Sequence, residues 1–169
     1  PQPEPEPEPE PQPEGDPLAI TDIRLRLSNN FLISIEEIQM WKNGINVLLS
    51  ASLDKSTAIT DDNSLININD ALITTKFTLS SSASSSSRII NLELDRPYSY
   101  NELDSLVIYL GDLGEGANRD AINGSFLDFM NANNSPIVSY EFNETSTNEN
   151  YPRVFKFNFT IGGRNEGLG

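Results

Sequence analysis

The 169-residue chain contains neither cysteine nor histidine, and these two absences exclude several classes of chemistry. Without cysteine there is no disulfide framework and no thiolate metal site. Without histidine the chain lacks the commonest general base and the commonest ligand for transition metals. Ser-His-Asp and Cys-His catalysis are therefore excluded within this chain. The absence of cysteine leaves the cellular compartment open, because many extracellular and virion proteins also lack it.

Basic side chains are few, and the resulting charge argues against two kinds of partner. The chain has 11 Lys and Arg against 25 Asp and Glu, which gives a net charge of −14. An acidic surface repels the phosphates of nucleic acids and of anionic membranes. No apolar run approaches the roughly 20 residues that are needed to cross a bilayer. We therefore expect neither a nucleic-acid partner nor insertion into a membrane.

Residues 1–17, PQPEPEPEPEPQPEGDP, alternate proline with glutamate or glutamine. Each proline fixes φ near −65° and drives the residue before it toward an extended conformation. This pattern predicts a polyproline II spacer that links one module to another. The alternative is that the segment lies ordered in a groove of a neighbouring protein. Because the chain begins within the repeat, we expect it to be a piece of a longer protein or a processed product.

The stretch 32–53 is the best-defined element of the remaining chain. Its alternation predicts a strand that ends at Asn43-Gly44, and both of these residues tolerate the positive φ angles of a type I′ hairpin turn. The alternation resumes at Ile45 and predicts a second strand. Trp41 is the only tryptophan of the chain, and we expect it to anchor the core, because large aromatic side chains dominate the packing of β cores.

Short alternating or apolar segments recur along the rest of the chain, separated by loops rich in Asn, Ser and Asp. They predict strands at residues 18–27, 76–79, 88–94, 106–110, 122–130, 137–142 and 153–161. We expect Asp95-Arg96-Pro97 to end one of these strands and a bulge near Gly124 to interrupt another. No segment has a pattern that predicts a helix. The pattern therefore favours an all-β, antiparallel jelly-roll sandwich of about eight strands.

This interpretation divides the chain into three parts. Residues 1–17 form the spacer, residues 18–161 the β-sandwich, and residues 162–169 a flexible tail. Within the sandwich, the serine-rich stretch 80–87 predicts a flexible surface loop.

Two acidic pairs, Glu36-Glu37 and Asp61-Asp62, raise the question of glycoside hydrolysis, which needs two convergent carboxyl groups. Adjacent residues of a strand point to opposite faces, so Glu36 and Glu37 cannot converge. The second pair lies in a cluster of turn residues. We interpret both pairs as solvated charges and do not expect an enzyme.

Four phrases resemble, in the same order, successive segments of the discoidin (factor V/VIII C-type) family, and especially the diverged copies in surface proteins of large DNA viruses. These phrases are IEEIQMWKNGINVLLSAS, LININDALITTKF, RIINLELDRPYSYNELDSLVIYLG and NRDAINGSFLDFMNANNSPIVSYEF. The family has a galactose-binding-like jelly-roll fold. The resemblance therefore implies this fold for the present chain.

Many members of the family bind sugars at one end of the sandwich, and many hold a structural calcium ion. The resemblance would make Asp70 and Thr75 the calcium ligands, because Ca²⁺ prefers hard oxygen donors. The alternative for Asp70 is an ordinary turn-capping role. The chain departs from the family pattern at Ala71, where the family has glycine, and at Phe77, where it has tryptophan. Arg119 matches a family arginine and is a candidate ligand contact, with an ion pair or loop anchor as the alternative.

Tyrosine and asparagine side chains supply the remaining candidates. Tyr98 and Tyr100 could stack on a sugar, and the alternative is that both pack over the end of the sandwich. Asn-x-Ser/Thr sequons for N-glycosylation occur at Asn123, Asn133, Asn143 and Asn158. Asn143 is the best of these candidates, because it lies in a loop rich in threonine and asparagine.

These observations predict a non-catalytic structural or attachment module on the surface of a larger assembly, such as a virion capsid or fibre. Its expected partners are other structural proteins of the same assembly, together with host glycans. Its expected location is the virion surface or the extracellular space. The alternative is a carbohydrate-binding module that a Pro/Glu-rich linker joins to a secreted enzyme. A catalytic domain encoded upstream would favour the alternative, and a capsid-type jelly roll would favour the first interpretation.

Overall fold

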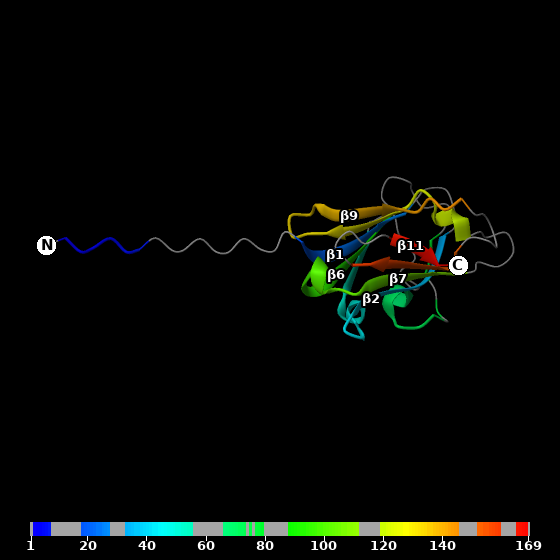
Figure 1. The fold of residues 1–169 in the computed structure, drawn as a ribbon, viewed down its shortest axis with the longest axis horizontal. Coiled ribbons are helices and arrows are strands. Elements are labelled where there is room, and N and C mark those ends of the chain that lie inside the picture. Colours follow the sequence, from blue (N-terminus) through cyan, green and yellow to red (C-terminus); the bar gives the residue numbers. More distant parts are fainter. Residues whose placement is uncertain are drawn as a thin grey trace.

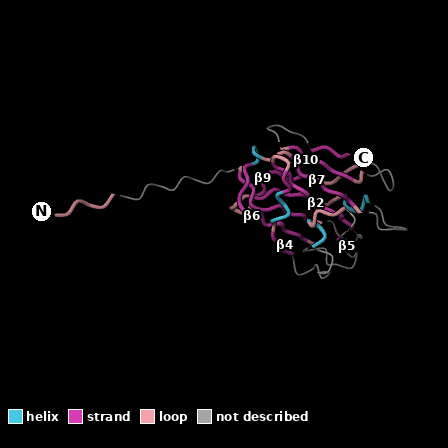
Figure 2. Tube along the Cα trace, turned by 90° about the horizontal axis from the view of Figure 1, so that it is seen from below, coloured by secondary structure: helices cyan, strands magenta, loops and turns pink. Residues whose placement is uncertain are grey.

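A computed structural model describes residues 2–7, 18–27, 33–55, 66–73, 75, 77–79, 88–111, 119–145, 152–159 and 165–168. Most of these residues belong to two antiparallel sheets, and the described helical segments are short 3₁₀ turns (Figures 1 and 2). The predicted all-β sandwich is therefore confirmed. The described residues form eleven strands, more than the eight or so expected. None of the described helical segments has the length and apolar character to span a membrane.

The first sheet has the strand order β4-β6-β1-β8-β9. Its strands are β4 (Ser52–Lys55), β6 (Ile89–Ser99), β1 (Ala19–Arg26), β8 (Phe126–Met130) and β9 (Pro136–Glu141). Ile23 of β1 lies opposite Leu92 on one side and Phe129 on the other, and all three are buried. The first predicted strand therefore forms the centre of this sheet.

The second sheet has the order β11-β10-β7-β2-β3, and β5 also pairs with β2. Its strands are β11 (Asn165–Leu168), β10 (Val154–Asn158), β7 (Ser105–Leu110), β2 (Ile33–Lys42), β3 (Ile45–Asn46) and β5 (Phe77–Leu79). The register between β2 and β7 shifts between Ile35 and Glu37. Beyond this bulge, Ile38 and Met40 are fully buried in the core. Side chains alternate along a strand, so Glu37 points to the outer face of the sheet.

Phenylalanine side chains fill the space between the sheets. Their rings and that of Tyr140 meet edge to face, with centroid separations from 4.7 to 6.4 Å among Phe129, Tyr140, Phe142, Phe155, Phe157 and Phe159. Aromatic rings favour this arrangement because of their quadrupoles. Trp41 is half-buried and lies outside the core cluster, so the prediction that it anchors the core is wrong. Its neighbour Met40 takes the inward-facing place on β2 instead.

The predicted hairpin turn is confirmed, but the strand after it is much shorter than expected. Asn43 and Gly44 have φ angles of 49° and 77°, as a type I′ turn requires. β3 then ends at Asn46, whose Oδ1 accepts hydrogen bonds from the backbone N–H of Met40 and of Leu48. This capping starts the 3₁₀ turn η1 (Val47–Ser50). The chain next enters β4, which belongs to the opposite sheet.

Three other segments differ from their predictions. Strand β6 continues past Pro97 to Ser99, because the β1–β6 register is irregular there and no ladder N–H is needed from a proline. The predicted strand 122–130 begins with the 3₁₀ turn η5 (Arg119–Ile122), and Gly124 has a φ of 84°. Residues 165–168 form β11, which pairs with β10, where composition predicts a flexible tail.

Several predicted features lie on segments with few or no described residues. The turn pair at Asp61-Asp62 and the serine-rich stretch 80–87 lie outside the described residues. Between these two stretches, the structure describes the 3₁₀ turn η2 (Ile66–Asn69). Of the predicted spacer, residues 2–7 are exposed and belong to neither a helix nor a strand (Figure 1).

Candidate functional site

The predicted ligand-binding residues lie at opposite ends of the sandwich. Tyr98 and Tyr100 lie beside the start of β1, because Ser99 is the register partner of Ala19. Arg119 begins η5, close to the other end of β1, where Arg26 pairs with Phe126. Figure 1 shows this separation between the green turn near β6 and the yellow turn on the far side. The structure therefore does not bring the three residues together.

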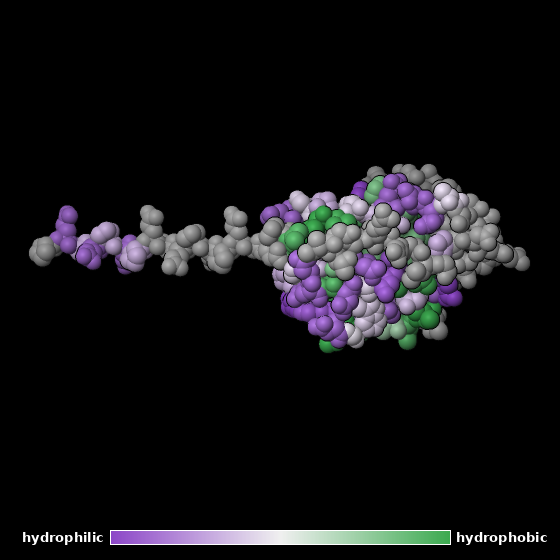
Figure 3. Space-filling view, viewed as in Figure 1, coloured by the Kyte–Doolittle hydropathy of each residue, from purple (hydrophilic) through white to green (hydrophobic). Residues whose placement is uncertain are grey.

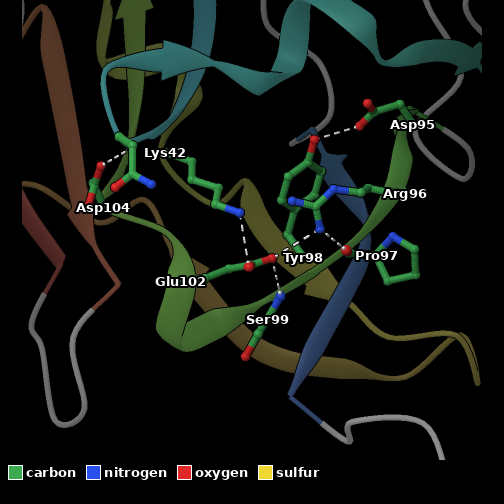
Figure 4. Close-up of polar contacts among 9 residues, drawn as sticks. Lys42, Asp95, Arg96, Pro97, Tyr98, Ser99, Glu102 and Asp104 are labelled. Carbon is green, nitrogen blue, oxygen red and sulfur yellow. Dashed lines mark hydrogen bonds and ion pairs between the residues drawn. The ribbon is translucent and has the colours of Figure 1, made fainter.

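Tyr98 is held in place by its own neighbours. Its residue is 4% exposed, and its hydroxyl donates a hydrogen bond of 2.7 Å to Asp95 Oδ1. The Arg96 guanidinium covers the ring at 3.9 Å from the centroid (Figure 4). Burial, and next the bond to Asp95, raise the pKa of the Tyr98 hydroxyl. Because arginine already occupies the ring face that a sugar would use, this geometry favours packing.

Tyr100 also has a packing role. It lies in the 3₁₀ turn η4 (Tyr100–Glu102), and its ring meets Phe159 edge to face at 5.1 Å. Its backbone N–H donates to the carbonyl oxygen of Leu18 at 2.8 Å. Burial raises the pKa of its hydroxyl. Tyr100 thus joins η4 to the residue that precedes β1.

Glu102 is the centre of a polar cluster at this end of the sandwich (Figure 4). Its carboxylate accepts hydrogen bonds from Lys42 Nζ at 3.0 Å, Arg96 Nη1 at 3.2 Å and the Ser99 N–H at 3.0 Å. The bond from Lys42 is the main cause that lowers the Glu102 pKa. The cluster connects the β2 hairpin to the end of β6, and we call it the spacer-end cluster.

Two backbone hydrogen bonds and one ion pair hold the opposite end of the sandwich. The N–H of Leu110 donates to the carbonyl oxygen of Arg153 at 2.7 Å, and the N–H of Gly111 to that of Ser34 at 3.1 Å. The Arg153 guanidinium also pairs with Glu36. The backbone of Arg119 is described at this end, whereas its side chain lies outside the description, so its ligand role stays a prediction. We call this region the distal end.

The sequons lie in different surroundings. Asn143 is exposed, and the Asn123 side chain donates to the carbonyl oxygen of Glu144 at 3.0 Å. Both are near the distal end, since the Gly124 N–H donates to Phe142 O. Asn158 is half-buried in β10. Among Asn123, Asn143 and Asn158, exposure therefore ranks Asn143 first, as the sequence also does, and glycosylation at these positions stays a prediction.

Asp70 and Thr75 lie together, as the resemblance implies. The Thr75 hydroxyl donates to Asp70 Oδ2 at 2.7 Å, and the Leu72 N–H donates to Asp70 Oδ1 at 2.9 Å. This is also the geometry of a turn-capping aspartate, the alternative that the sequence leaves open. Ala71 has a φ of 68°, the left-handed conformation that favours glycine.

Sequence reasoning missed Glu37, which faces this turn. Its residue is 0% exposed, and neither carboxylate oxygen has a hydrogen-bond partner. The groups of the turn that act on its pKa are the Asp70 carboxyl and the backbone of Ala71 and Leu72. Burial, and then the Asp70 carboxyl, raise the Glu37 pKa to about 8. The prediction that Glu37 is a solvated charge is therefore wrong, because the 66–75 segment covers it.

The oxygen atoms around Asp70 suit the calcium ion that the resemblance implies. The donor set comprises the Asp70 and Glu37 carboxylates and the Thr75 hydroxyl, which also lies 3.3 Å from the carbonyl oxygen of Leu72. Calcium prefers such a mixture of carboxylate, hydroxyl and carbonyl oxygens. Among the described residues, no three acidic, histidine or cysteine side chains form a metal cluster. Two carboxylates would therefore carry the charge, and neutral oxygens would complete the shell.

No family model, curated protein or solved structure matches this chain.

Proposed function

We propose that this chain is a non-catalytic attachment module, carried by the Pro/Glu spacer on the surface of a larger assembly. The setting that we favour is a virion capsid or fibre, and the topology that we favour for the sandwich is that of a jelly roll. The observation on which the proposal rests is the spacer-end cluster. Its hydrogen bonds hold together the β2 hairpin and the end of β6, at the end of the sandwich where β1 begins. The distal end is then the part of the module that meets a ligand.

Hydrogen bonds within the sandwich hold the end at which β1 begins. The backbone bond from Tyr100 to Leu18 holds the residue just before β1. Glu102 fixes η4 through Lys42 and Arg96, and Asp104 Oδ2 accepts from the Asn43 N–H at 2.7 Å. A spacer that meets a well-ordered end of the module directs the other end outward. Loops at one end of a β-sandwich commonly carry its binding function.

The net charge and the apolar residues of the surface indicate which class of ligand the module binds. The net charge of −14 disfavours phosphates and sulfates, and it favours neutral glycans or a basic protein surface. Figure 3 shows apolar surface in separate small areas on the visible face, rather than in one continuous patch. In the part of the chain that the structure describes, the exposed large apolar residues are Leu18, Ile45, Leu49, Leu72 and Ile73. We therefore favour host glycans at the distal end, with other structural proteins of the assembly held through the spacer.

A glycan array with the full chain tests this proposal, run once with calcium and once with chelator. The expected result is saturable binding to a defined neutral glycan. Arg119→Ala, at the distal end, should weaken this binding at least tenfold. Tyr98→Phe, at the spacer end, removes one hydroxyl and should leave binding unchanged.

A blank array in both buffers would reject glycan binding. Binding that Tyr98→Phe abolishes and Arg119→Ala spares would reject the distal end as the binding surface. The setting is tested separately, with an antibody against the chain applied to intact particles of the source. Labelling of the particle surface is expected, and labelling confined to soluble protein would contradict the virion setting.

A further inference from the structure

The sequence contains two Asn-Gly pairs, and the structure places them in different surroundings. Asn43-Gly44 forms the hairpin turn after β2, and Asn123-Gly124 lies between η5 and β8. An asparagine before glycine can cyclise, because glycine has no side chain that shields its backbone nitrogen from the preceding amide carbon. The reaction needs a glycine N–H that is free of hydrogen bonds and a connecting peptide that is free to rotate.

Hydrogen bonds restrain both reacting groups of the Asn123-Gly124 pair. The Asn123 side-chain amide donates to the carbonyl oxygen of Glu144 at 3.0 Å. The Gly124 N–H donates to the carbonyl oxygen of Phe142 at 2.8 Å. Rotation of the peptide between the two residues would break the bond to Phe142, and the loss of a backbone hydrogen bond is costly. The fold therefore protects Asn123 from cyclisation.

The Asn43-Gly44 pair has neither of these restraints. Both residues are exposed, and a Cβ added to Gly44 would meet no atom within 4 Å. Within the part of the chain that the structure describes, no hydrogen bond involves the Asn43 side chain, its carbonyl oxygen or the Gly44 N–H. The Asn43 N–H donates to Asp104 Oδ2 at 2.7 Å, and this bond lies before the peptide that must rotate. That peptide is therefore free to rotate while the hairpin keeps its place.

The two turn types of hairpins explain how this rotation brings the reacting atoms together. The φ angles of Asn43 and Gly44 are 49° and 77°, the pattern of a type I′ turn. A type II′ turn keeps the positive φ at the first central residue and reverses its sign at the second, so a flip of the central peptide converts one type into the other. Glycine accepts either sign of φ. The flip turns the Gly44 nitrogen toward the Asn43 side chain and leaves the flanking strands in place.

We propose that Asn43 is a modification site at which the chain loses a side-chain amide through a cyclic imide. The Gly44 nitrogen bonds to Asn43 Cγ, the bond from Cγ to Nδ2 breaks, and the Gly44 proton leaves with that nitrogen as ammonia. Water then opens the imide at one of its two carbonyl carbons. Opening at Cγ gives aspartate, and opening at the backbone carbonyl gives isoaspartate, in which the main chain continues through the side chain. Both products carry an added negative charge.

The modification acts on the spacer-end cluster, because the turn belongs to the β2 hairpin that the cluster holds. The new carboxylate belongs to the residue whose N–H binds Asp104, and the preceding Lys42 donates to Glu102 at 3.0 Å. Negative charge is thus added beside two acids. Isoaspartate also lengthens the main chain within a two-residue turn, where loop length sets the register of the strands. The modified chain should therefore unfold at a lower temperature.

Peptide mapping of the full chain by mass spectrometry tests the proposal, after storage at mildly alkaline pH. The peptide that contains Asn43 should gain the mass difference between an amide and an acid. An isoaspartate-specific methyltransferase with a labelled methyl donor should mark the same peptide. The peptide that contains Asn123 should convert at least tenfold more slowly. Asn43→Gln should remove the label, because glutamine forms the corresponding larger ring far less readily.

The same measurement on the chain unfolded in urea is the control for the fold. Both Asn-Gly pairs are free there and should convert at similar rates, because each has the same reacting groups. A folded chain in which the two pairs convert equally fast, or in which Asn123 converts first, would overturn the proposal. An Asn43 peptide that converts in urea and stays unchanged in the folded chain would also overturn it, since the turn would then protect the asparagine.

Discussion

Arg153 donates to both carboxylate oxygens of Glu36, at 3.0 and 2.8 Å, across 117 residues of sequence. Arg153 precedes β10 and Glu36 lies in β2, and these strands are not neighbours, because β7 lies between them. The ion pair therefore passes over the end of β7 at the distal end. The Glu36 side chain is only 12% exposed, which separates this pair from ordinary surface ion pairs.

Loss of this ion pair should destabilise the distal end. We expect Glu36→Gln to lower the free energy of unfolding by about 1–2 kcal/mol, because it weakens the charge-assisted hydrogen bonds of a carboxylate whose side chain is only 12% exposed. Urea denaturation followed by circular dichroism measures the change. Glu93→Gln removes the same charge from an exposed site and should cost less than about 0.5 kcal/mol. Equal effects of the two substitutions would show that the pair contributes nothing specific.

Gly111, which follows β7, leaves no room for a side chain. A Cβ at this position would lie 2.3 Å from Ser34 Oγ and 3.1 Å from Ser34 Cβ. Gly111→Ala should therefore destabilise the fold by about 1–3 kcal/mol, as overpacking does in other cores. Ser34→Ala removes the nearer atom and should restore part of this loss in the double variant. A double-mutant cycle that shows simple additivity would argue against this contact.

Stability should depend on pH through the buried carboxyl of Glu37. Its pKa is about 8 in the folded protein against an ordinary value of 4.5, so the folded state holds the proton more tightly. The stabilisation that comes from this tighter proton binding is fully present below pH about 4.5. It is lost as pH rises through the window from 4.5 to 8, and it is absent above that window. At about 1.4 kcal/mol per pKa unit, the fall amounts to several kcal/mol.

The difference between the natural chain and Glu37→Gln isolates this contribution, with unfolding measured in chelator across that window. This subtraction is needed because Glu102 also titrates with a shifted pKa. Its pKa is lowered in the folded protein, so the stability that it contributes is lost as pH falls. A flat difference curve would mean that Glu37 titrates normally.

Ala71 has a φ of 68° in the turn that holds Asp70, a conformation that costs about 1–2 kcal/mol for a residue with a Cβ. Ala71→Gly should stabilise the chain by about 0.5–1 kcal/mol, after allowance for the greater freedom of glycine when unfolded. The midpoint of thermal unfolding measures this gain. Ala121→Gly, in η5, is the control and should destabilise. A loss of stability in Ala71→Gly would show that the turn is not strained.

Apolar alternation was sufficient to predict most of the strands. Strand β10 illustrates the reason: Phe155, Phe157 and Phe159 are all buried, and alternation alone places them on one face. The Asn43-Gly44 turn was equally readable, because its φ requirement is local. The end of β3 could not be predicted from the sequence, since it depends on the hydrogen bond that the Met40 N–H of the neighbouring strand donates to Asn46 Oδ1.

The candidate site also has one part that the sequence indicates and another part that it does not. Asp70 and Thr75 are five residues apart, and their contact is a local turn that a sequence can indicate. Glu37 lies 33 residues before Asp70, and its surroundings depend on a bulge in β2 and on the segment that packs over it. Tyr98 and Arg119 were grouped from the sequence, but the sandwich places them at opposite ends.

The sequence by itself determined the class of fold, the places of most strands, the charge and the absence of histidine and cysteine chemistry, because these follow from composition and from periodicity along the chain. The tertiary structure alone decided which polar groups are buried and which of them meet. Burial is a property of what packs over a residue, and for Glu37 the covering segment comes from elsewhere in the chain. For this reason the acid that appeared solvated in the sequence is the least solvated acid of the site.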